Sequence, residues 1–95
     1  MSVQELKEIE CYVHGAIIGV GFRNFAKVKA DELHIYGFAE NTPEGTVKVV
    51  GQGNEAVLRR FIEILSVGPE TAEVESIDIN WNKVISTHYS VFEVR

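Results

Sequence analysis

The residues best suited to chemistry in this chain are three glycines followed by an arginine: Gly15, Gly19, Gly21 and Arg23. Glycine reaches backbone conformations that a side chain forbids, so a glycine-rich loop can turn successive N–H groups into one hollow. Such a hollow beside a helix N-terminus attracts anions, and the planar guanidinium of Arg23 suits phosphate oxygens. The stretch therefore indicates a phosphate-binding loop, although a glycine-rich connection between a strand and a helix can also be an ordinary turn.

The spacing of these glycines excludes the two best-known phosphate-binding motifs. No lysine and hydroxyl residue follow Gly21, so the stretch is not the loop G-x-x-x-x-G-K-[ST]. Glycines at 15, 19 and 21 do not match the dinucleotide fingerprint G-x-G-x-x-G either. A phosphate site here would therefore be of another kind, made of backbone amides and one arginine.

A strand and a helix are predicted on the two sides of this loop. Apolar residues at 9, 11 and 13 alternate with polar ones from Glu8 to His14, which predicts a half-buried strand with Cys11 on its apolar face. Apolar residues at helical spacing then predict a helix from about Phe22 to Leu33. His34 follows this helix at a position that commonly takes a left-handed conformation.

The rest of the chain predicts one more helix and four more strands. A hairpin is expected from strands at 35–41 and 46–51, joined by the turn signal Asn41-Thr42-Pro43-Glu44-Gly45. Asn54 is a suitable N-cap for a helix that ends near Ser66, before Gly68 and Pro69. Strands are expected at 72–81, with a bulge near 75–76 and Trp81 packed, and at 89–94, with a polar loop at 82–88 between them.

The order of these elements predicts the fold class. Two strand–helix–strand crossovers in the order βαββαβ give the ferredoxin-like split βαβ arrangement, an α+β fold. Its sheet is mostly antiparallel, and both helices cover one face. A further short strand is expected at the end of the chain.

Composition limits the partners. The chain has 95 residues, which is the size of a single domain spanning residues 1–95, and a formal net charge of −5. This charge disfavours nucleic acid and anionic membranes as partners, and no apolar stretch is long enough to span a bilayer. The lone cysteine cannot form an internal disulfide, which fits a reducing compartment. Taken together, these features lead us to expect a cytoplasmic monomer.

Two common catalytic systems are not indicated. The three histidines, at 14, 34 and 88, do not have the spacing of metal ligands, so neither a metal nor another cofactor is expected. The serines lack the motif that surrounds a nucleophilic serine in hydrolases. We expect His14 to be a solvated surface residue.

From about Ile9 to Val94, the chain resembles the acylphosphatase family. The resemblance rests on several short matches in order: Gly15-Ala16-Ile17-Ile18-Gly19-Val20-Gly21-Phe22-Arg23, Tyr36-Gly37-Phe38-Ala39-Glu40-Asn41, Thr42-Pro43-Glu44-Gly45-Thr46-Val47, Val67-Gly68-Pro69 and Ala72-Glu73-Val74. It implies hydrolysis of an acyl phosphate to a carboxylate and inorganic phosphate. The absence of metal-ligand and nucleophile motifs is consistent with a reaction without a metal or a covalent intermediate. The resemblance also implies that Arg23 and Asn41 are the catalytic residues, Asn41 by positioning the attacking water. The phosphate would be held by backbone amides of the loop: Gly15, Ala16, Ile17, Ile18, Gly19 and Val20.

One departure keeps a second hypothesis open. The family usually has Val-Gln where this chain has Ile17-Ile18, so a polar side chain is lost although the backbone amides remain. A non-catalytic or weakly active ferredoxin-like module that binds an anion is therefore the alternative. An RNA-recognition module has the same element order, but the strand at 46–50 lacks the exposed aromatic residues on which bases stack.

Overall fold

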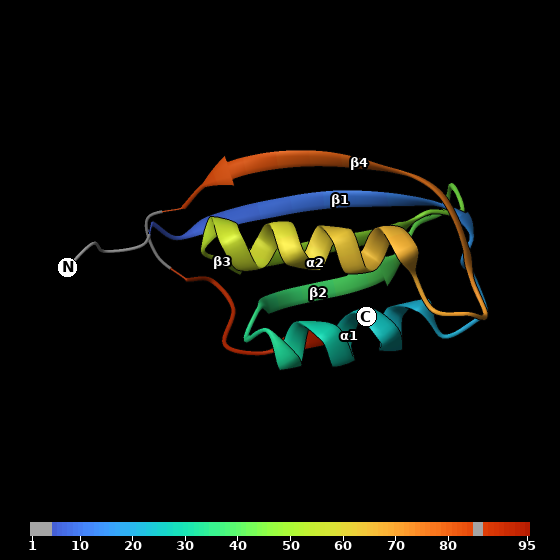
Figure 1. Ribbon diagram of the computed structural model, residues 1–95, viewed down its shortest axis with the longest axis horizontal. Helices are drawn as coiled ribbons and strands as arrows, with labels where there is room; N and C mark the ends of the chain where they lie inside the picture. The colour runs from blue at the N-terminus through green and yellow to red at the C-terminus, as the bar shows by residue number, and fades with distance from the viewer. Residues whose placement is uncertain (1–4, 85–86) are drawn as a thin grey trace.

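Five strands and two helices make up the computed structural model, which describes residues 5–84 and 87–95 (Figure 1). In chain order they are β1 (Lys7–Ala16), α1 (Phe22–Glu32), β2 (Tyr36–Asn41), β3 (Val47–Gly53), α2 (Glu55–Val67), β4 (Glu73–Lys83) and β5 (Phe92–Val94). No helix within the described residues is long and apolar enough to cross a membrane.

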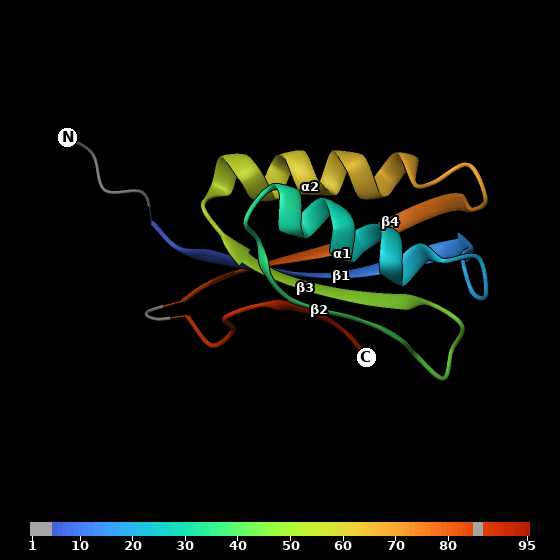
Figure 2. The same cartoon turned by 90° about the horizontal axis from the view of Figure 1, so that it is seen from below.

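The strands form one sheet in the order β4-β1-β3-β2-β5. All neighbours are antiparallel except β2 and β5, which are parallel. Both helices cover the same face of this sheet (Figure 2). The predicted ferredoxin-like arrangement is confirmed, including the short additional strand, which lies at one edge beside β2.

The core lies between the helices and the covered face of the sheet. The alternating residues Ile9, Cys11 and Val13 of β1 are fully buried, as predicted. The helices contribute buried residues at the predicted spacing, and these are Phe22, Ala26 and Ala30 of α1 and Leu58, Phe61 and Leu65 of α2. Phe61 packs edge-on against Phe92 with ring centroids 6.1 Å apart, which ties the last strand to α2.

Local signals place the helix ends. Asn54 caps α2, and its Oδ1 accepts a hydrogen bond from the Val57 amide at 3.0 Å. His34, just after α1, has a φ of 56° and is the one non-glycine residue with positive φ among the described residues. Both features agree with the sequence, and both helices end within one residue of the predicted positions.

The register of β1 and β4 differs from a regular ladder at one point. His14 is paired with Ser76 and Gly15 with Val74, which leaves Glu75 as an extra residue in β4. This is the bulge predicted from the out-of-phase apolar residue Val74. The pairing also continues β1 to Ala16, so Gly15 and Ala16 belong to the strand and not, as expected, to the loop.

Two predicted boundaries near the C-terminus are wrong. The last strand is Phe92–Val94 and not 89–94, because only three of its residues pair with β2. Strand β4 continues to Lys83, into the predicted polar loop, of which residues 85 and 86 lie outside the described residues. Trp81, expected to be packed, is 38% exposed on this edge strand, and the Arg59 guanidinium lies 5.2 Å from its ring centroid.

Candidate active site

The connection between β1 and α1, here called the glycine loop (residues 17–21), has two residues in the left-handed region. Gly19 has a φ of 76° and Gly21 a φ of 79°, which only glycine adopts at little cost. The two isoleucines at its start differ in environment: Ile17 is buried, whereas Ile18 is 46% exposed. Ile17 therefore packs on the core and holds the loop there. Of the two isoleucines that stand where the family usually has Val-Gln, only Ile18 places an apolar side chain at the surface.

A hollow of about 260 Å³ lies between the glycine loop, the start of α1, the end of β2 and the end of β5. It is lined by eight residues: Ile17, Gly19, Gly21, Phe22, Arg23, Asn24, Asn41 and Val94. It brings Arg23 and Asn41 together, as the sequence prediction required. The hollow includes only part of the predicted loop set, because Gly15, Ala16, Ile18 and Val20 do not line it.

The N-terminus of α1 opens into this hollow without a side-chain cap. Its N-cap residue is Gly21, no side chain accepts a hydrogen bond there, and the first turn holds no acidic residue. Helix α2 differs, because the Asn54 side chain accepts a hydrogen bond from one of its N-terminal amides, that of Val57, and the acidic Glu55 stands in its first turn. The partial positive charge at the start of α1 is therefore available to an external anion.

Arg23 is oriented by the C-terminal end of the described chain. Its Nη1 donates a hydrogen bond to the main-chain oxygen of Arg95 at 2.6 Å. Arg95 is itself held by its amide, which donates to the Ala39 carbonyl at 2.9 Å, and by its guanidinium, 3.9 Å from the Phe38 ring centroid. One nitrogen of the Arg23 guanidinium is thus used for orientation, and the other donors remain for a ligand.

Asn41 is the last residue of β2 and leads into a tight, hydrogen-bonded turn. The Thr42 amide donates to the Thr46 carbonyl at 2.9 Å, and the hydroxyls of these two threonines lie 2.7 Å apart. The Gly45 amide also donates to the Thr42 carbonyl at 3.1 Å. These hydrogen bonds fix the backbone directly after Asn41, and they therefore restrict the position of the Asn41 side chain, which lines the hollow.

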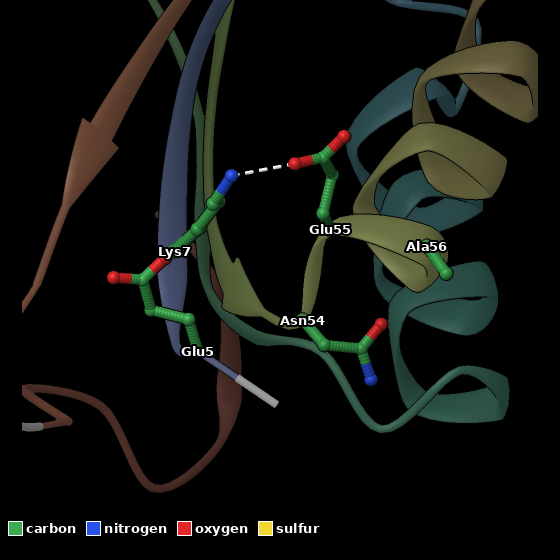
Figure 3. Close-up of a pocket in the computed structure, with 5 residues that line it drawn as sticks. All are labelled: Glu5, Lys7, Asn54, Glu55 and Ala56. Atoms are coloured by element: carbon green, nitrogen blue, oxygen red, sulfur yellow. Dashed lines mark hydrogen bonds and ion pairs between the residues drawn. The ribbon is translucent and has the colours of Figure 1, made fainter. Parts of the chain in front are cut away.

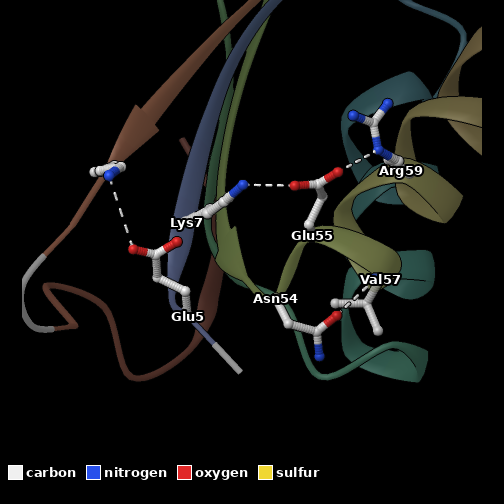
Figure 4. Close-up of polar contacts among 7 residues, drawn as sticks. Glu5, Lys7, Asn54, Glu55, Val57 and Arg59 are labelled. Atoms are coloured by element: carbon white, nitrogen blue, oxygen red, sulfur yellow. Dashed lines mark hydrogen bonds and ion pairs between the residues drawn. The ribbon is translucent and has the colours of Figure 1, made fainter. Parts of the chain in front are cut away.

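A second hollow, of about 310 Å³, lies at the other end of the molecule, near the start of α2 (Figure 3). Its charged residues are all in ion pairs: Lys7 Nζ lies 2.5 Å from Glu55 Oε1, the neighbouring Arg59 Nε lies 2.8 Å from Glu55 Oε2, and Glu5 Oε1 lies 4.0 Å from Lys83 Nζ (Figure 4). The hydrogen bonds from Lys7 and then Arg59 lower the pKa of the Glu55 carboxyl. This hollow is better explained as an ion-pair network that joins β1 to α2 than as a binding site.

Other reactive residues lie outside the first hollow. Cys11 is fully buried, and its burial, with the nearby charge of Glu10, raises the pKa of its thiol to about 12. It is therefore a core residue, as predicted. His14 Nε2 lies 2.9 Å from Asp78 Oδ2 in an exposed pair on the sheet. Within the described ranges, no group of three or more His, Cys, Asp or Glu side chains could hold a metal ion.

The sequence prediction did not include several residues of the hollow. Asn24 and Val94 line it, and Arg95 orients Arg23, although none of the three carries a recognisable motif. The position of Asn24 beside Arg23 was the only available signal. Val94 and Arg95 enter through the parallel pairing of β5 with β2, which no local pattern in the sequence encodes.

Comparison with known proteins gives one consistent family. A family model described as acylphosphatase matches residues 9–94. The acylphosphatase of Methanococcoides burtonii is 39% identical over 83 residues, which are 87% of this chain and 86% of that protein. The acylphosphatase of Thermus thermophilus is 44% identical over 71 residues, 75% of this chain and 81% of that protein. The crystal structure of the Bacillus subtilis acylphosphatase is similar with a TM-score of 0.89, at 26% identity, over 94% of this chain and 98% of that one.

Proposed function

Because the chain belongs to the acylphosphatase family, as its sequence predicted, we propose that it hydrolyses acyl phosphates at the hollow beside the glycine loop. The matched relatives carry the name of an enzyme, so the comparisons support a hydrolase and give no support to a non-catalytic module. The roles of individual residues in this reaction, and the use of no metal, are part of the proposal.

One observation carries the proposal: the hollow combines a free helix N-terminus, an arginine and an asparagine amide. The first two are donors suited to the oxygens of a phosphate group. The Asn41 amide stays neutral at ordinary pH, so it can accept a hydrogen bond from water and donate another, but it cannot act as a strong base. This set of groups fits a reaction that needs charge stabilisation and a positioned water.

Acyl phosphate hydrolysis is such a reaction. The oxygen of water forms a bond to phosphorus while the bond from phosphorus to the acyl oxygen breaks, and the carboxylate leaves with that electron pair. One proton of the water passes to a phosphoryl oxygen, so that the products are the carboxylate and dihydrogen phosphate. A carboxylate is a good leaving group, so no strong general acid is required. Positioning and stabilisation of the phosphoryl oxygens then provide most of the rate enhancement.

In the proposed mechanism, Arg23 and the backbone amides of the glycine-loop residues that line the hollow, Ile17, Gly19 and Gly21, hold the phosphoryl oxygens. Their donors are fixed before the substrate arrives, so little reorganisation is needed as charge shifts in the transition state. Asn41 aligns the attacking water opposite the departing carboxylate. Ile18 does not line the hollow, so its apolar side chain at the surface is compatible with this mechanism.

The test is hydrolysis of benzoyl phosphate by the purified protein, with a chelator present, beside the Asn41→Ala variant. We expect chelator-resistant turnover by the wild type and a fall in kcat of roughly 10²- to 10³-fold in the variant, comparable to the loss of one oxyanion donor. Asn80→Ala is the matched control, because Asn80 is an exposed asparagine of β4 outside the hollow.

Two results would contradict this proposal. Wild-type protein that is folded and binds inorganic phosphate, but releases no benzoate, would favour the anion-binding module instead. Full turnover by folded Asn41→Ala protein would exclude a water-positioning role for Asn41.

We further propose that residues 1–95 act as one domain, as a monomer in the cytoplasm, on a small anionic substrate and not on nucleic acid or membranes. One aromatic ring on the uncovered face of the sheet, that of Phe38, supports the exclusion of RNA. Phe38 is only 6% exposed: the Tyr89 ring packs against it with centroids 5.9 Å apart, and the cations of Lys48 and Arg95 lie over it. A base would have to displace these cations before it could stack.

A further inference from the structure

The glycine loop is supported from one side of the sheet only. Strand β1 has two neighbours, but its pairing with β3 ends at Val13. Beyond that point Gly15 and Ala16 are paired with Val74 and Glu73 of the edge strand β4. Besides the packing of Ile17 on the core, the support for the loop therefore comes from β4 and from the connection that leads into it.

That connection is a short turn with fixed ends. The Gly68 amide donates to the Ile64 carbonyl at 3.0 Å at the end of α2, and the Ala72 amide donates to the Pro69 carbonyl at 3.1 Å. The turn and the glycine loop lie at the same end of the molecule (Figures 1 and 2). Thr71 is held inside this turn.

Thr71 makes a direct bond to the glycine loop. Its Oγ1 donates to the main-chain oxygen of Val20 at 2.9 Å, across a separation of 51 residues. The Val20 carbonyl and the Gly21 N–H belong to one planar trans peptide unit, in which the two groups point in opposite directions. A hydroxyl that holds the carbonyl on the side of the turn therefore also fixes the direction of the Gly21 N–H.

The peptide unit between Val20 and Gly21 is otherwise easy to rotate. Reversing it requires changes in ψ of Val20 and in φ of Gly21, and glycine tolerates either sign of φ. No atom from outside the local chain lies within 4 Å of the position that a Cβ would occupy on Gly21, so tertiary packing at that point does not restrict the backbone. Gly21 lines the hollow, and a reversed peptide would present a carbonyl oxygen where an amide is needed.

We propose that Thr71 is a positioning residue for the anion site: its hydroxyl holds the Val20–Gly21 peptide in the orientation that directs the Gly21 amide toward the bound phosphate. This inference rests on the proposed function, because it assigns the bound anion to that reaction. It adds a residue from outside the glycine loop, and it predicts an effect on phosphate binding without any contact to phosphate.

The experiment compares Thr71→Val, which keeps the shape and removes the hydroxyl, with Thr71→Ser, which keeps the hydroxyl. Ser66→Ala is the matched control, because Ser66 Oγ also donates to a main-chain oxygen, that of Ile62 at 2.7 Å, within α2. Three quantities are measured: the Kd of inorganic phosphate, kcat/KM for benzoyl phosphate, and the NMR relaxation dispersion of the Gly21 amide without ligand.

In Thr71→Val, we expect the Kd of phosphate to rise and kcat/KM to fall by about three- to tenfold, the range that one neutral hydrogen bond provides. The Gly21 amide should show exchange broadening in this variant only. Thr71→Ser should stay within about twofold of the wild type, since serine can still donate the bond.

Wild-type binding and an unchanged Gly21 amide in folded Thr71→Val would overturn the inference. An equal loss in Thr71→Ser would also overturn it, because the effect would then come from the methyl group. If the wild type hydrolyses no benzoyl phosphate, only the proposed function is refuted. The relaxation dispersion of the Gly21 amide would still show whether Thr71 controls the Val20–Gly21 peptide.

Discussion

Replacement of Arg23 by lysine and by alanine should separate the geometry of its guanidinium from its charge. In the structure Nη1 is bonded to the main-chain oxygen of Arg95 at 2.6 Å, which leaves the other donors of the fork for two phosphoryl oxygens. A lysine ammonium keeps the charge, but it has one nitrogen and cannot hold Arg95 and two phosphoryl oxygens in the same geometry.

The size of the effect follows from the number of bonds lost. A hydrogen bond to a charged group contributes about 1.5–3 kcal/mol, so loss of two such bonds costs about 3–6 kcal/mol. At 1.4 kcal/mol for each tenfold change, Arg23→Ala should lower kcat/KM for benzoyl phosphate by roughly 10²- to 10⁴-fold. Arg23→Lys should lose about half of that free energy, a fall of roughly tenfold to 10²-fold.

Steady-state hydrolysis with a chelator present, combined with urea unfolding, is the assay. The bond to Arg95 is exposed, so the free energy of unfolding should fall by no more than about 1 kcal/mol in either variant. Arg60→Ala is the control, since Arg60 lies on the exposed face of α2 and should leave turnover unchanged. Turnover by Arg23→Lys within threefold of the wild type would refute the reasoning, because charge alone would then be sufficient.

Three further substitutions test the framework of the fold. Gly15→Ala should lower the free energy of unfolding, measured in urea, by more than about 3 kcal/mol, because a Cβ would lie 2.0 Å from the Glu73 carbonyl oxygen. A loss of less than about 1 kcal/mol would mean that β4 can move away from the new side chain. His34→Gly should raise the free energy of unfolding by about 0.5–1 kcal/mol, since glycine relieves the positive φ of an exposed residue; an unchanged urea midpoint would show that no strain is present. The lowered pKa of Glu55 means that its stabilising contribution is complete above its ordinary value of 4.5 and decreases as pH falls below that value. Glu55→Gln should therefore lower the melting temperature at pH 7 and lower it less at pH 3. Equal effects at both pH values would contradict the ion-pair assignment.

The helices and the β2–β3 hairpin could be predicted because their signals are local. Asn54 marks the start of α2, His34 follows the end of α1, and the turn after Asn41 contains proline and glycine at suitable positions. The bulge in β4 could also be predicted, since Val74 breaks an otherwise regular alternation. In each case a few neighbouring residues determine the backbone conformation.

The limits of prediction lie where distant segments pair. The local sequence at Gly15 is compatible with a loop, and β1 continues through it only because β4 pairs with it. The last strand is short because only its end reaches β2, and the contact between Arg23 and Arg95 joins residues 72 positions apart. The approach of Asn41 to Arg23 was predicted from the family resemblance, and the spacing of the residues alone did not require it.

The sheet order has a consequence for how the protein loses its activity. The hollow depends on both edges of the sheet: β4 and its preceding turn hold the glycine loop, and the chain just after β5 holds Arg23. Each edge strand is hydrogen-bonded to a neighbour on one side only, so we expect it to open locally at a lower free energy than the central strands. Opening of either one dismantles the binding site while the three central strands stay folded. In a urea titration, turnover should therefore decline before the buried Cys11 of the central strand β1 reacts with a thiol reagent, so that hydrolysis reports the integrity of the edges and the cysteine reports that of the core.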